Sequence, residues 1–200
     1  MTNKFHHFPF PITTPRLLLR PPCIADSSIV NAGIKESFHQ LNKWMPWAQQ
    51  PQSLEDTELF VRQSVANWIV QKNEEPWLPI FIFDRTTQEF IGATGYHHLQ
   101  WDVPCLEMGY WIRASKSGNG LMTEAVNALT RYAFEELRVR RVAITCDAQN
   151  IPSQKIALRL GFRHEATLTQ NRVMVDGTIS DTFIFVRHSV TDLPVLKVAW

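Results

Sequence analysis

Long apolar runs are missing from this sequence. The longest apolar stretch, around Pro76 to Phe83, is far shorter than the ~20 residues that a membrane-spanning helix needs. The first 25 residues contain Lys4, two histidines and five prolines, and they include neither a continuous apolar segment nor a small-residue cleavage motif. We therefore expect no secretory signal and no membrane partner, and we predict a cytoplasmic protein.

Cysteine is scarce. Cys23, Cys105 and Cys146 are odd in number and widely spaced, which fits neither a disulfide framework nor a C-x-x-C metal or redox site. His97 and His98 are adjacent in a predicted strand, so their side chains are expected on opposite faces, where they cannot easily share a metal ion. The sequence thus predicts free thiols in a reducing compartment and no bound metal.

The chain also has no excess charge of one sign. Its 20 Lys and Arg residues against 19 Asp and Glu residues give a formal net charge of +1. Nucleic-acid binding needs a concentrated basic surface, so no direct binding to nucleic acid is expected. With 200 residues the chain can bury a core without disulfides or metal, and we predict one domain over residues 1–200. The sequence allows either a monomer or a homodimer.

Hydrophobic periodicity predicts an α/β fold with a mixed sheet. The predicted strands are Thr14–Pro22, Pro79–Asp84, Glu89–His97, Cys105–Ile112, Arg141–Asp147 and Thr182–Val186. The three strands between residues 79 and 112 are expected to form an antiparallel meander. A strand, a helix over Thr123–Leu137 and another strand then imply parallel neighbours. Asp176-Gly177 predicts the turn of a final hairpin.

Helix starts are predicted from capping residues. Asp26 is expected to cap the first helix, and Ser53 with Asp56 forms a capping box at the start of the second. The second helix should bury an apolar stripe formed by Val61, Val65, Trp68 and Ile69. A short helix over Ser153–Leu160 should end at Gly161.

The segment from Glu107 to Ala125 is the most informative part of the sequence. A predicted strand runs into a loop that contains Gly118 and Gly120, and this loop opens directly into an amphipathic helix. Free backbone amides at such a junction, together with the helix dipole, can bind a phosphate or pyrophosphate. The motifs of a P-loop and of a dinucleotide-binding fold are both missing. Taken alone, the loop could equally be a turn with no ligand.

Ser117-Gly118-Asn119-Gly120-Leu121-Met122 resembles the Q/R-x-x-G-x-G/A pyrophosphate loop of the Gcn5-related N-acetyltransferase (GNAT) superfamily. Ser117 stands where that pattern has Gln or Arg, and Met122 replaces its last small residue. Further matching segments follow in the same order over residues ~12 to ~187, and the ending Gly-Leu-Met-Thr-Glu-Ala is similar to the Rim-type ribosomal-protein alanine N-acetyltransferases. These segments are residues 13–20, 44–48, 107–112, 150–153, 160–162 and 176–181.

The resemblance implies a GNAT-like fold: a mostly antiparallel central sheet, flanked by helices, with a splayed strand pair at the cofactor site. It also implies that acetyl-CoA is the cosubstrate. Exposed backbone near Ile112 and Arg113 would pair with the pantetheine amides, and the amides of Ser117, Gly118, Asn119, Gly120, Leu121 and Met122 would hold the pyrophosphate. Asn150 matches a family position that contacts the pantetheine arm. Ser153 matches the position that protonates the departing CoA thiolate.

Glu107 and Ser153 are the catalytic candidates. The family places a carboxylate such as Glu107 beside the thioester as a general base, although a solvated carboxylate on the polar face of a strand is the alternative. Ser153 could instead serve as the N-cap of the short helix, and both roles could coexist. Trp44, Trp47 and Trp101 could line an acceptor cleft or belong to the core.

The resemblance implies direct transfer of an acetyl group from acetyl-CoA to a primary amine in a ternary complex, with no metal. At pH 7.5 an α-amine of pKa ~7.8 is roughly one-third neutral, whereas a lysine of pKa ~10.4 is only ~0.1% neutral. The Rim-type resemblance implies that the acceptor is the N-terminal α-amine of a protein, such as a ribosomal protein, and these neutral fractions favour an α-amine over a lysine. A small-molecule amine and a non-catalytic acyl-CoA sensor are the alternatives.

Overall fold

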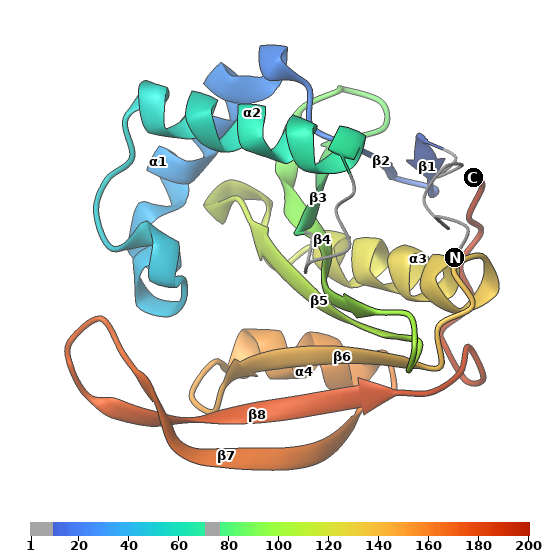
Figure 1. Ribbon diagram of the computed structural model, residues 1–200. Helices are drawn as coiled ribbons and strands as arrows, with labels where there is room; N and C mark the ends of the chain where they lie inside the picture. Colours follow the sequence, from blue (N-terminus) through green and yellow to red (C-terminus); the bar gives the residue numbers. More distant parts are fainter. Residues whose placement is uncertain (1–9, 71–76) are drawn as a thin grey trace.

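The computed structural model describes residues 10–70 and 77–200. Its β-strands form one sheet in the order β1-β2-β3-β4-β5-β6-β8-β7, in which β5 and β6 are parallel and the other neighbours antiparallel (Figure 1). The strands are β1 (Ile12–Thr13), β2 (Leu17–Arg20), β3 (Leu78–Asp84), β4 (Phe90–Gln100), β5 (Cys105–Ile112), β6 (Arg141–Asp147), β7 (Arg163–Val173) and β8 (Ile179–Arg187). The predicted mixed sheet, its meander and its one parallel pair are confirmed.

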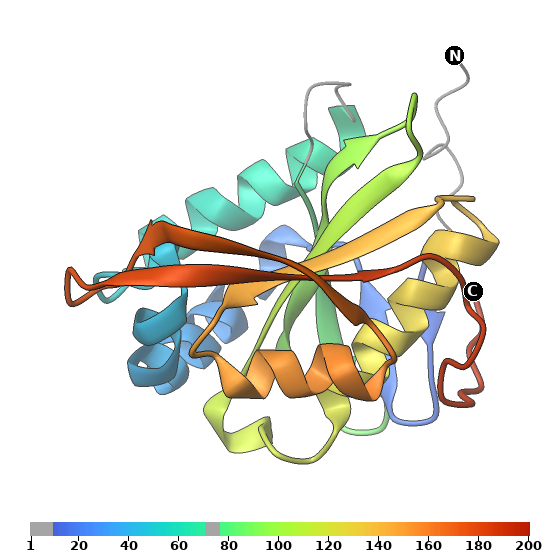
Figure 2. The same ribbon diagram turned by 90° about the horizontal axis from the view of Figure 1, so that it is seen from below.

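The helices cover the two faces of this sheet (Figures 1 and 2). They are α1 (Ser27–Trp44), α2 (Leu54–Val70), α3 (Leu121–Glu135) and α4 (Ile151–Arg159). Short 3-10 turns occupy Ile24–Asp26, Pro46–Ala48 and Ala114–Lys116. Within residues 10–70 and 77–200, no helix combines the length and apolarity needed to cross a bilayer.

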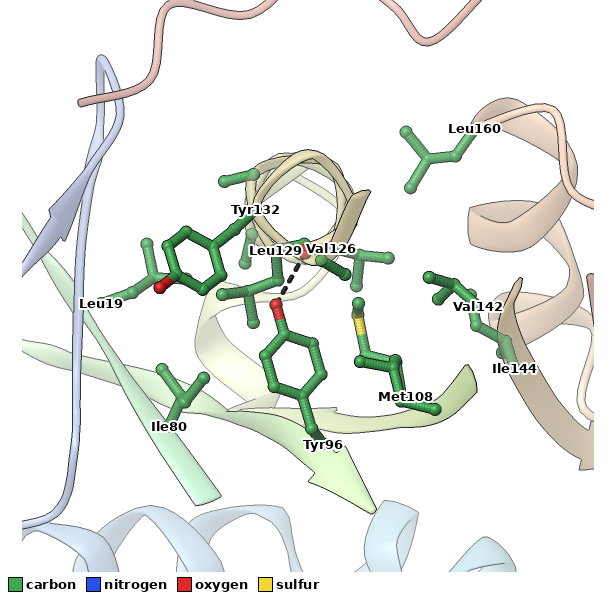
Figure 3. Packing of buried hydrophobic residues seen from close by; sticks show 14 of the residues in the cluster. Leu19, Ile80, Tyr96, Met108, Val126, Leu129, Tyr132, Val142, Ile144 and Leu160 are labelled. Atoms are coloured by element: carbon green, nitrogen blue, oxygen red, sulfur yellow. Dashed lines mark hydrogen bonds between the residues drawn. The ribbon is translucent and has the colours of Figure 1, made fainter. Parts of the chain in front are cut away.

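Two clusters of apolar side chains hold the layers together. The run from Leu78 to Phe83 is buried on both faces of β3, because Ile80 and Ile82 point toward α3 while Phe81 and Phe83 point toward α1 and α2. The larger cluster surrounds α3, where the Tyr96 hydroxyl donates a hydrogen bond of 2.7 Å to the backbone oxygen of Leu129 (Figure 3). Burial of this kind is the main source of the sheet's stability.

The capping predictions are confirmed for α2 and only partly for α1. The Ser53 hydroxyl accepts from the Asp56 amide at 3.1 Å, and the Asp56 carboxylate accepts from the Ser53 amide at 2.9 Å. Asp26 precedes α1 as expected, but its carboxylate binds the Arg20 guanidinium and the Cys23 amide and makes no cap bond to α1. It therefore closes the preceding 3-10 turn.

The predicted apolar stripe on α2 was wrong at one residue, Ile69, which is not buried. Val61 is fully buried, and the Trp68 indole donates a hydrogen bond of 2.7 Å to the Pro79 carbonyl on β3. Ile69 is 77% exposed. Trp68 faces the sheet, and the next residue of an α-helix points about 100° away from it. The side chain of Ile69 therefore lies on the solvent side.

Candidate active site

The site begins where β5 and β6 separate. The two strands are paired at Cys105, Leu106 and Glu107, opposite residues 141–143. Beyond Glu107, β5 stays paired with β4 as far as Ile112, but it is no longer paired with β6. Figure 1 shows the two strands side by side at their first residues and well apart at their ends. The splayed strand pair is thus present, with Glu107 at its apex.

The open part of β5 directs backbone groups into this gap. The Arg113 amide donates to the Ile91 carbonyl on β4 at 2.9 Å. Backbone groups alternate in direction along a strand, so those of Tyr110 and Ile112 point away from β4 and toward the gap. The Arg113 amide is therefore already bonded within the sheet, contrary to the prediction of exposed backbone there, whereas the backbone groups of Ile112 face the gap.

A cavity of about 750 Å³ occupies the gap and extends to the end of α1. Nine of the predicted site residues line it: Glu107, Ile112, Ser117, Gly118, Gly120, Leu121, Met122, Asn150 and Ser153. Arg113 and Asn119 are not part of its wall. The Arg113 guanidinium forms an ion pair with Glu36 on α1, and the Asn119 side chain donates to the Ser117 carbonyl at 3.2 Å.

The glycine loop has the conformation that an anion site requires. Gly118 and Gly120 have φ values of 80° and 74°, in the left-handed region that favours glycine. Gly120 is also the N-cap of α3, and it has no side chain to occupy the amides of the first turn. Those amides and the positive end of the helix dipole lie next to the cavity, because Leu121 and Met122 line it.

Contacts from the turn between β1 and β2 hold this loop in place. The Arg16 guanidinium donates to the Asn119 carbonyl at 2.9 Å and to the Glu124 carboxylate at 2.6 Å. The Thr14 hydroxyl also donates to Glu124, at 2.6 Å. Since Glu124 lies in the first turn of α3, these bonds fix both the loop and the helix start.

Glu107 lies on β5, and its side chain is 20% exposed. Its Oε1 accepts a hydrogen bond from the Thr145 hydroxyl of β6. The same oxygen lies 4.0 Å from Nε2 of His97, which is the residue opposite Glu107 on β4. One carboxylate oxygen is thus oriented by neighbours, which leaves Oε2 for a ligand in the cavity.

Ser153 does not cap α4, contrary to one of the two roles predicted for it. The N-cap is Asn150, whose side-chain oxygen accepts from the Ser153 amide at 3.2 Å. Ser153 lines the cavity, and its hydroxyl lies 3.0 Å from the Tyr110 hydroxyl. Burial raises the pKa of Tyr110 well above its ordinary value, and the hydrogen bond with Ser153 opposes this only in part. The phenol therefore keeps its proton near neutral pH.

The prediction that His97 and His98 face opposite sides was wrong. The strand register shifts after His97, and His98 has a φ of 50°, so the two ring centroids lie 5.1 Å apart. Strict alternation fails at such a bulge. In the part of the chain that the structure describes, no group of three or more potential ligands is placed to hold a metal ion.

Two of the three tryptophans take one of the two predicted roles, and Trp47 takes neither. Trp44 lines the cavity, Trp101 packs against the main core, and Trp47 is 43% exposed beside Trp111. Cys146 also lines the cavity, where burial raises the pKa of its thiol. A thiol that holds its proton is a poor nucleophile, so Cys146 is not placed to form a covalent acyl intermediate.

Thr145, His97 and the Arg16–Glu124 pair were not predicted as parts of the site. The register of the meander could have placed His97 opposite Glu107, because the two strands and their connection were predicted correctly. No local pattern pairs Arg16 with Glu124, since the two residues are 108 positions apart.

The fold, the split strand pair and the glycine loop at a helix N-terminus define a class of acyl-transferring enzymes. Residues 16–163 match the family described as "Acetyltransferase (GNAT) domain", and the chain belongs to this family. It is an acetyl-CoA-dependent N-acetyltransferase, as its sequence motifs predicted.

Relatives with assigned acceptors include the ribosomal-protein-serine acetyltransferase of Escherichia coli (strain K12), which is 31% identical over 137 residues, 68% of this chain and 73% of the relative. Among solved structures, the fold resembles RimL, a ribosomal L7/L12 α-N-protein acetyltransferase in complex with coenzyme A, with a TM-score of 0.79, 22% identity and coverage of 90% and 97%. It also resembles the Microcin C7 self-immunity acetyltransferase MccE in complex with acetyl-CoA and AMP, with a TM-score of 0.78, 23% identity and coverage of 88% of this chain and 93% of MccE.

Proposed function

We propose that this enzyme transfers the acetyl group of acetyl-CoA to the N-terminal α-amine of a protein, such as a ribosomal protein, in the cytoplasm. The observation that carries the proposal is the cavity between β5 and β6, which has a carboxylate, Glu107, at its closed end and a glycine loop at its mouth. The relative in E. coli, named for a ribosomal-protein serine, supports a protein acceptor.

The cavity wall fits acetyl-CoA. The backbone groups of Tyr110 and Ile112 could pair with the pantetheine amides as an added strand would. The loop from Ser117 to Gly120 and the first turn of α3 offer amides for the pyrophosphate. Space for a ligand is already present at the loop, because a Cβ placed on Gly118 would meet no atom within 4 Å. Replacement of the family's Gln or Arg by Ser117 leaves these backbone donors intact.

Proton transfers complete the proposed reaction. Glu107 accepts the proton that the ammonium must lose before its nitrogen can attack the thioester carbonyl. A C–N bond then forms, the C–S bond breaks to leave CoA thiolate, and the nitrogen loses its second proton. The Ser153 hydroxyl donates a proton to this thiolate and takes up the proton that the nitrogen loses, while the Tyr110 hydroxyl, 3.0 Å away, orients it. Acetyl transfer in this form needs no covalent enzyme intermediate.

The chemistry of the acceptor favours an α-amine. Deprotonation of a lysine of pKa ~10.4 at pH 7.5 costs ~4 kcal/mol, whereas an α-amine of pKa ~7.8 costs well under ~1 kcal/mol. A single partly exposed carboxylate is better matched to the smaller requirement.

The acceptor is tested with matched peptides. We expect a peptide with a free N-terminus to be acetylated faster than the same sequence with a blocked N-terminus and one internal lysine. Released CoA is measured by thiol titration, and mass spectrometry locates the acetyl group. Equal or reversed rates would refute the α-amine proposal. Faster turnover of small amines would favour a small-molecule acceptor, and CoA binding without transfer to any amine would favour a sensor.

A further inference from the structure

The side chain of His97 is 27% exposed, but its ring nitrogen Nε2 is buried and has no hydrogen-bond partner among the described residues. A buried donor or acceptor without a partner is destabilising, so stability alone does not account for an imidazole at this position. The nearest acidic group to Nε2 is the Glu107 carboxylate, with the two atoms 4.0 Å apart. A closure of about 1 Å would make this contact a hydrogen bond.

The surroundings of His97 set the ring in this position. Trp77 packs its edge against the imidazole, with the ring centroids 5.0 Å apart and the planes at 89°. On β5, Gly109 leaves room for the ring, because a Cβ at that position would lie 3.1 Å from Nε2. Thr145 holds Glu107 from the opposite side. The imidazole and the carboxylate are thus held facing each other at the closed end of the cavity.

We propose that His97 is a positioning and proton-accepting partner of Glu107, which makes the base of this enzyme a carboxylate–imidazole pair. Nε2 itself is shielded from solvent, so the acceptor amine meets Glu107 and not His97. The N–H bond of the ammonium breaks as Glu107 receives the proton, and the O–H bond of Glu107 then breaks as an N–H bond forms at Nε2. The resulting imidazolium lies beside the carboxylate, and after the product leaves its proton returns to Glu107 and passes from there to solvent. This inference rests on the proposed function.

The chemical reason lies in the strength of the two bases. An ordinary carboxylic acid has a pKa of about 4.3 and an α-ammonium a pKa of about 7.8, so a lone carboxylate holds that proton poorly. Imidazole, with an ordinary pKa of about 6.5, is a closer match to the ammonium.

The resting state of His97 suits this role. Burial lowers the pKa of His97, and neighbouring His98 on β4 lowers it further, whereas the Glu107 carboxylate on β5 opposes this shift. Glu107 and His98 are the titratable groups that the described structure places against the ring. His97 is therefore neutral near pH 7 and able to accept a proton, and the adjacent carboxylate stabilises the charge when it arrives.

The test compares the parent enzyme with His97→Gln over about pH 6 to 9.5, with acetyl-CoA and an N-terminal peptide both saturating. We expect His97→Gln to lower kcat by about 10- to 100-fold at pH 6.5. The ratio of the parent kcat to the His97→Gln kcat should approach one above pH ~8, where most of the acceptor amine is already neutral when it binds. A purely structural role would lower kcat by the same factor at every pH, and that result would overturn the proposal.

Three controls keep the outcome specific. His98→Gln alters the adjacent exposed histidine and should keep the kcat of the parent at pH 6.5 to within about twofold, with at most a small shift of the pH profile from the loss of its charge beside His97. The double variant His97→Gln with Glu107→Gln should be no slower than Glu107→Gln alone, because His97 acts through Glu107. If His97→Gln is poorly folded, His97→Ala with added imidazole replaces it, and rate recovery with imidazole is expected.

A readout without turnover separates this inference from the proposed function. Histidine-selective NMR titration of the parent and of Glu107→Gln should show the pKa of His97 falling when the carboxylate is removed. An unchanged His97 titration would refute the pair even in an active enzyme. Absence of acetylation in the parent, combined with a clear shift in the titration, would instead refute the proposed function and leave the pair in place.

Discussion

The two ends of β5 have different roles although they belong to one strand. At its start, residues 105–107 are paired on both sides, and Leu106 is 2% exposed opposite the fully buried Val142 of β6. At its end, the strand is paired with β4 only, and the other side faces the cavity. A paired edge gives stability, whereas an unpaired edge gives backbone groups that a ligand can use. Changes at the open end should therefore affect binding and catalysis, and changes at the paired end should affect folding.

The largest effect is expected at the loop that follows the open end. Gly120→Trp should abolish acetyl-CoA binding, because an indole would fill the space beside the first-turn amides of α3 and the φ of 74° disfavours any side chain. Gly177→Trp is the matched control, since Gly177 has a φ of 82° and open surroundings in the turn between β7 and β8. Calorimetry on both variants decides the matter. Equal affinity in Gly120→Trp and the parent would show that the loop is only a turn.

At the point where the strands separate, Glu107→Gln should lower kcat by ~10²–10⁴ while acetyl-CoA affinity is retained. Gln has nearly the same shape but cannot accept the proton. The defect should shrink as the pH rises past the pKa of the amine, which is measured as kcat between pH ~6.5 and ~9.5. Glu165→Gln on β7, whose carboxylate pairs with Arg141, serves as the control for loss of a carboxylate. A variant as fast as the parent at low pH would show that Glu107 is only a solvated side chain.

The paired end gives the opposite outcome. Leu106→Ala should reduce the free energy of unfolding by about 2–5 kcal/mol through lost burial and a residual cavity. The fraction of enzyme that remains folded should keep its KM for acetyl-CoA, because Leu106 is not part of the cavity wall. Urea denaturation and initial rates at low temperature measure the two quantities. A large rise in KM with unchanged stability would contradict the division between the two ends.

The smallest effect is expected where the open end is tied to α1. The Arg113 guanidinium and the Ser115 amide lower the pKa of Glu36 from 4.5 to about 2. Since the folded-state pKa is the lower one, the ion pair stabilises the fold above pH ~4.5 and this contribution is lost as the pH falls toward ~2. The pair is partly exposed, so Glu36→Gln should cost under ~1 kcal/mol at pH 7 and still less at pH 3. Urea denaturation at both pH values measures it, and a cost that grows on acidification would be inconsistent with this assignment.

The sequence predicted the paired parts of the molecule better than the open ones. β5 and β6 have the predicted bounds, because continuous apolar residues between polar turns mark a buried strand. The separation of the two strands came only from the family resemblance, since no local pattern distinguishes the residues before and after Glu107. Alternation also failed at His98, where a left-handed residue turns two neighbouring rings toward each other.

Choices between equivalent residues were likewise beyond local rules. Asn150 and Ser153 are both residue types that can cap a helix. In the structure Asn150 caps α4, and the Ser153 hydroxyl is engaged with Tyr110 on β5. Arg113 follows the open strand as predicted, but Glu36 on α1 draws its guanidinium away from the cavity. Each of these outcomes depends on a partner distant in sequence, which a reading along the chain cannot supply.

The contacts that fix the glycine loop also bear on the order of events during folding. Arg16 and Asn119 are 103 positions apart, and Thr14 and Glu124 are 110 apart. Contacts between residues so far apart in sequence form slowly, because closing a long loop costs conformational entropy before the contact can stabilise the chain. Secondary structure and much of the meander can therefore assemble while the loop still fluctuates. A refolding chain should regain its circular dichroism before it regains the ability to capture its cosubstrate.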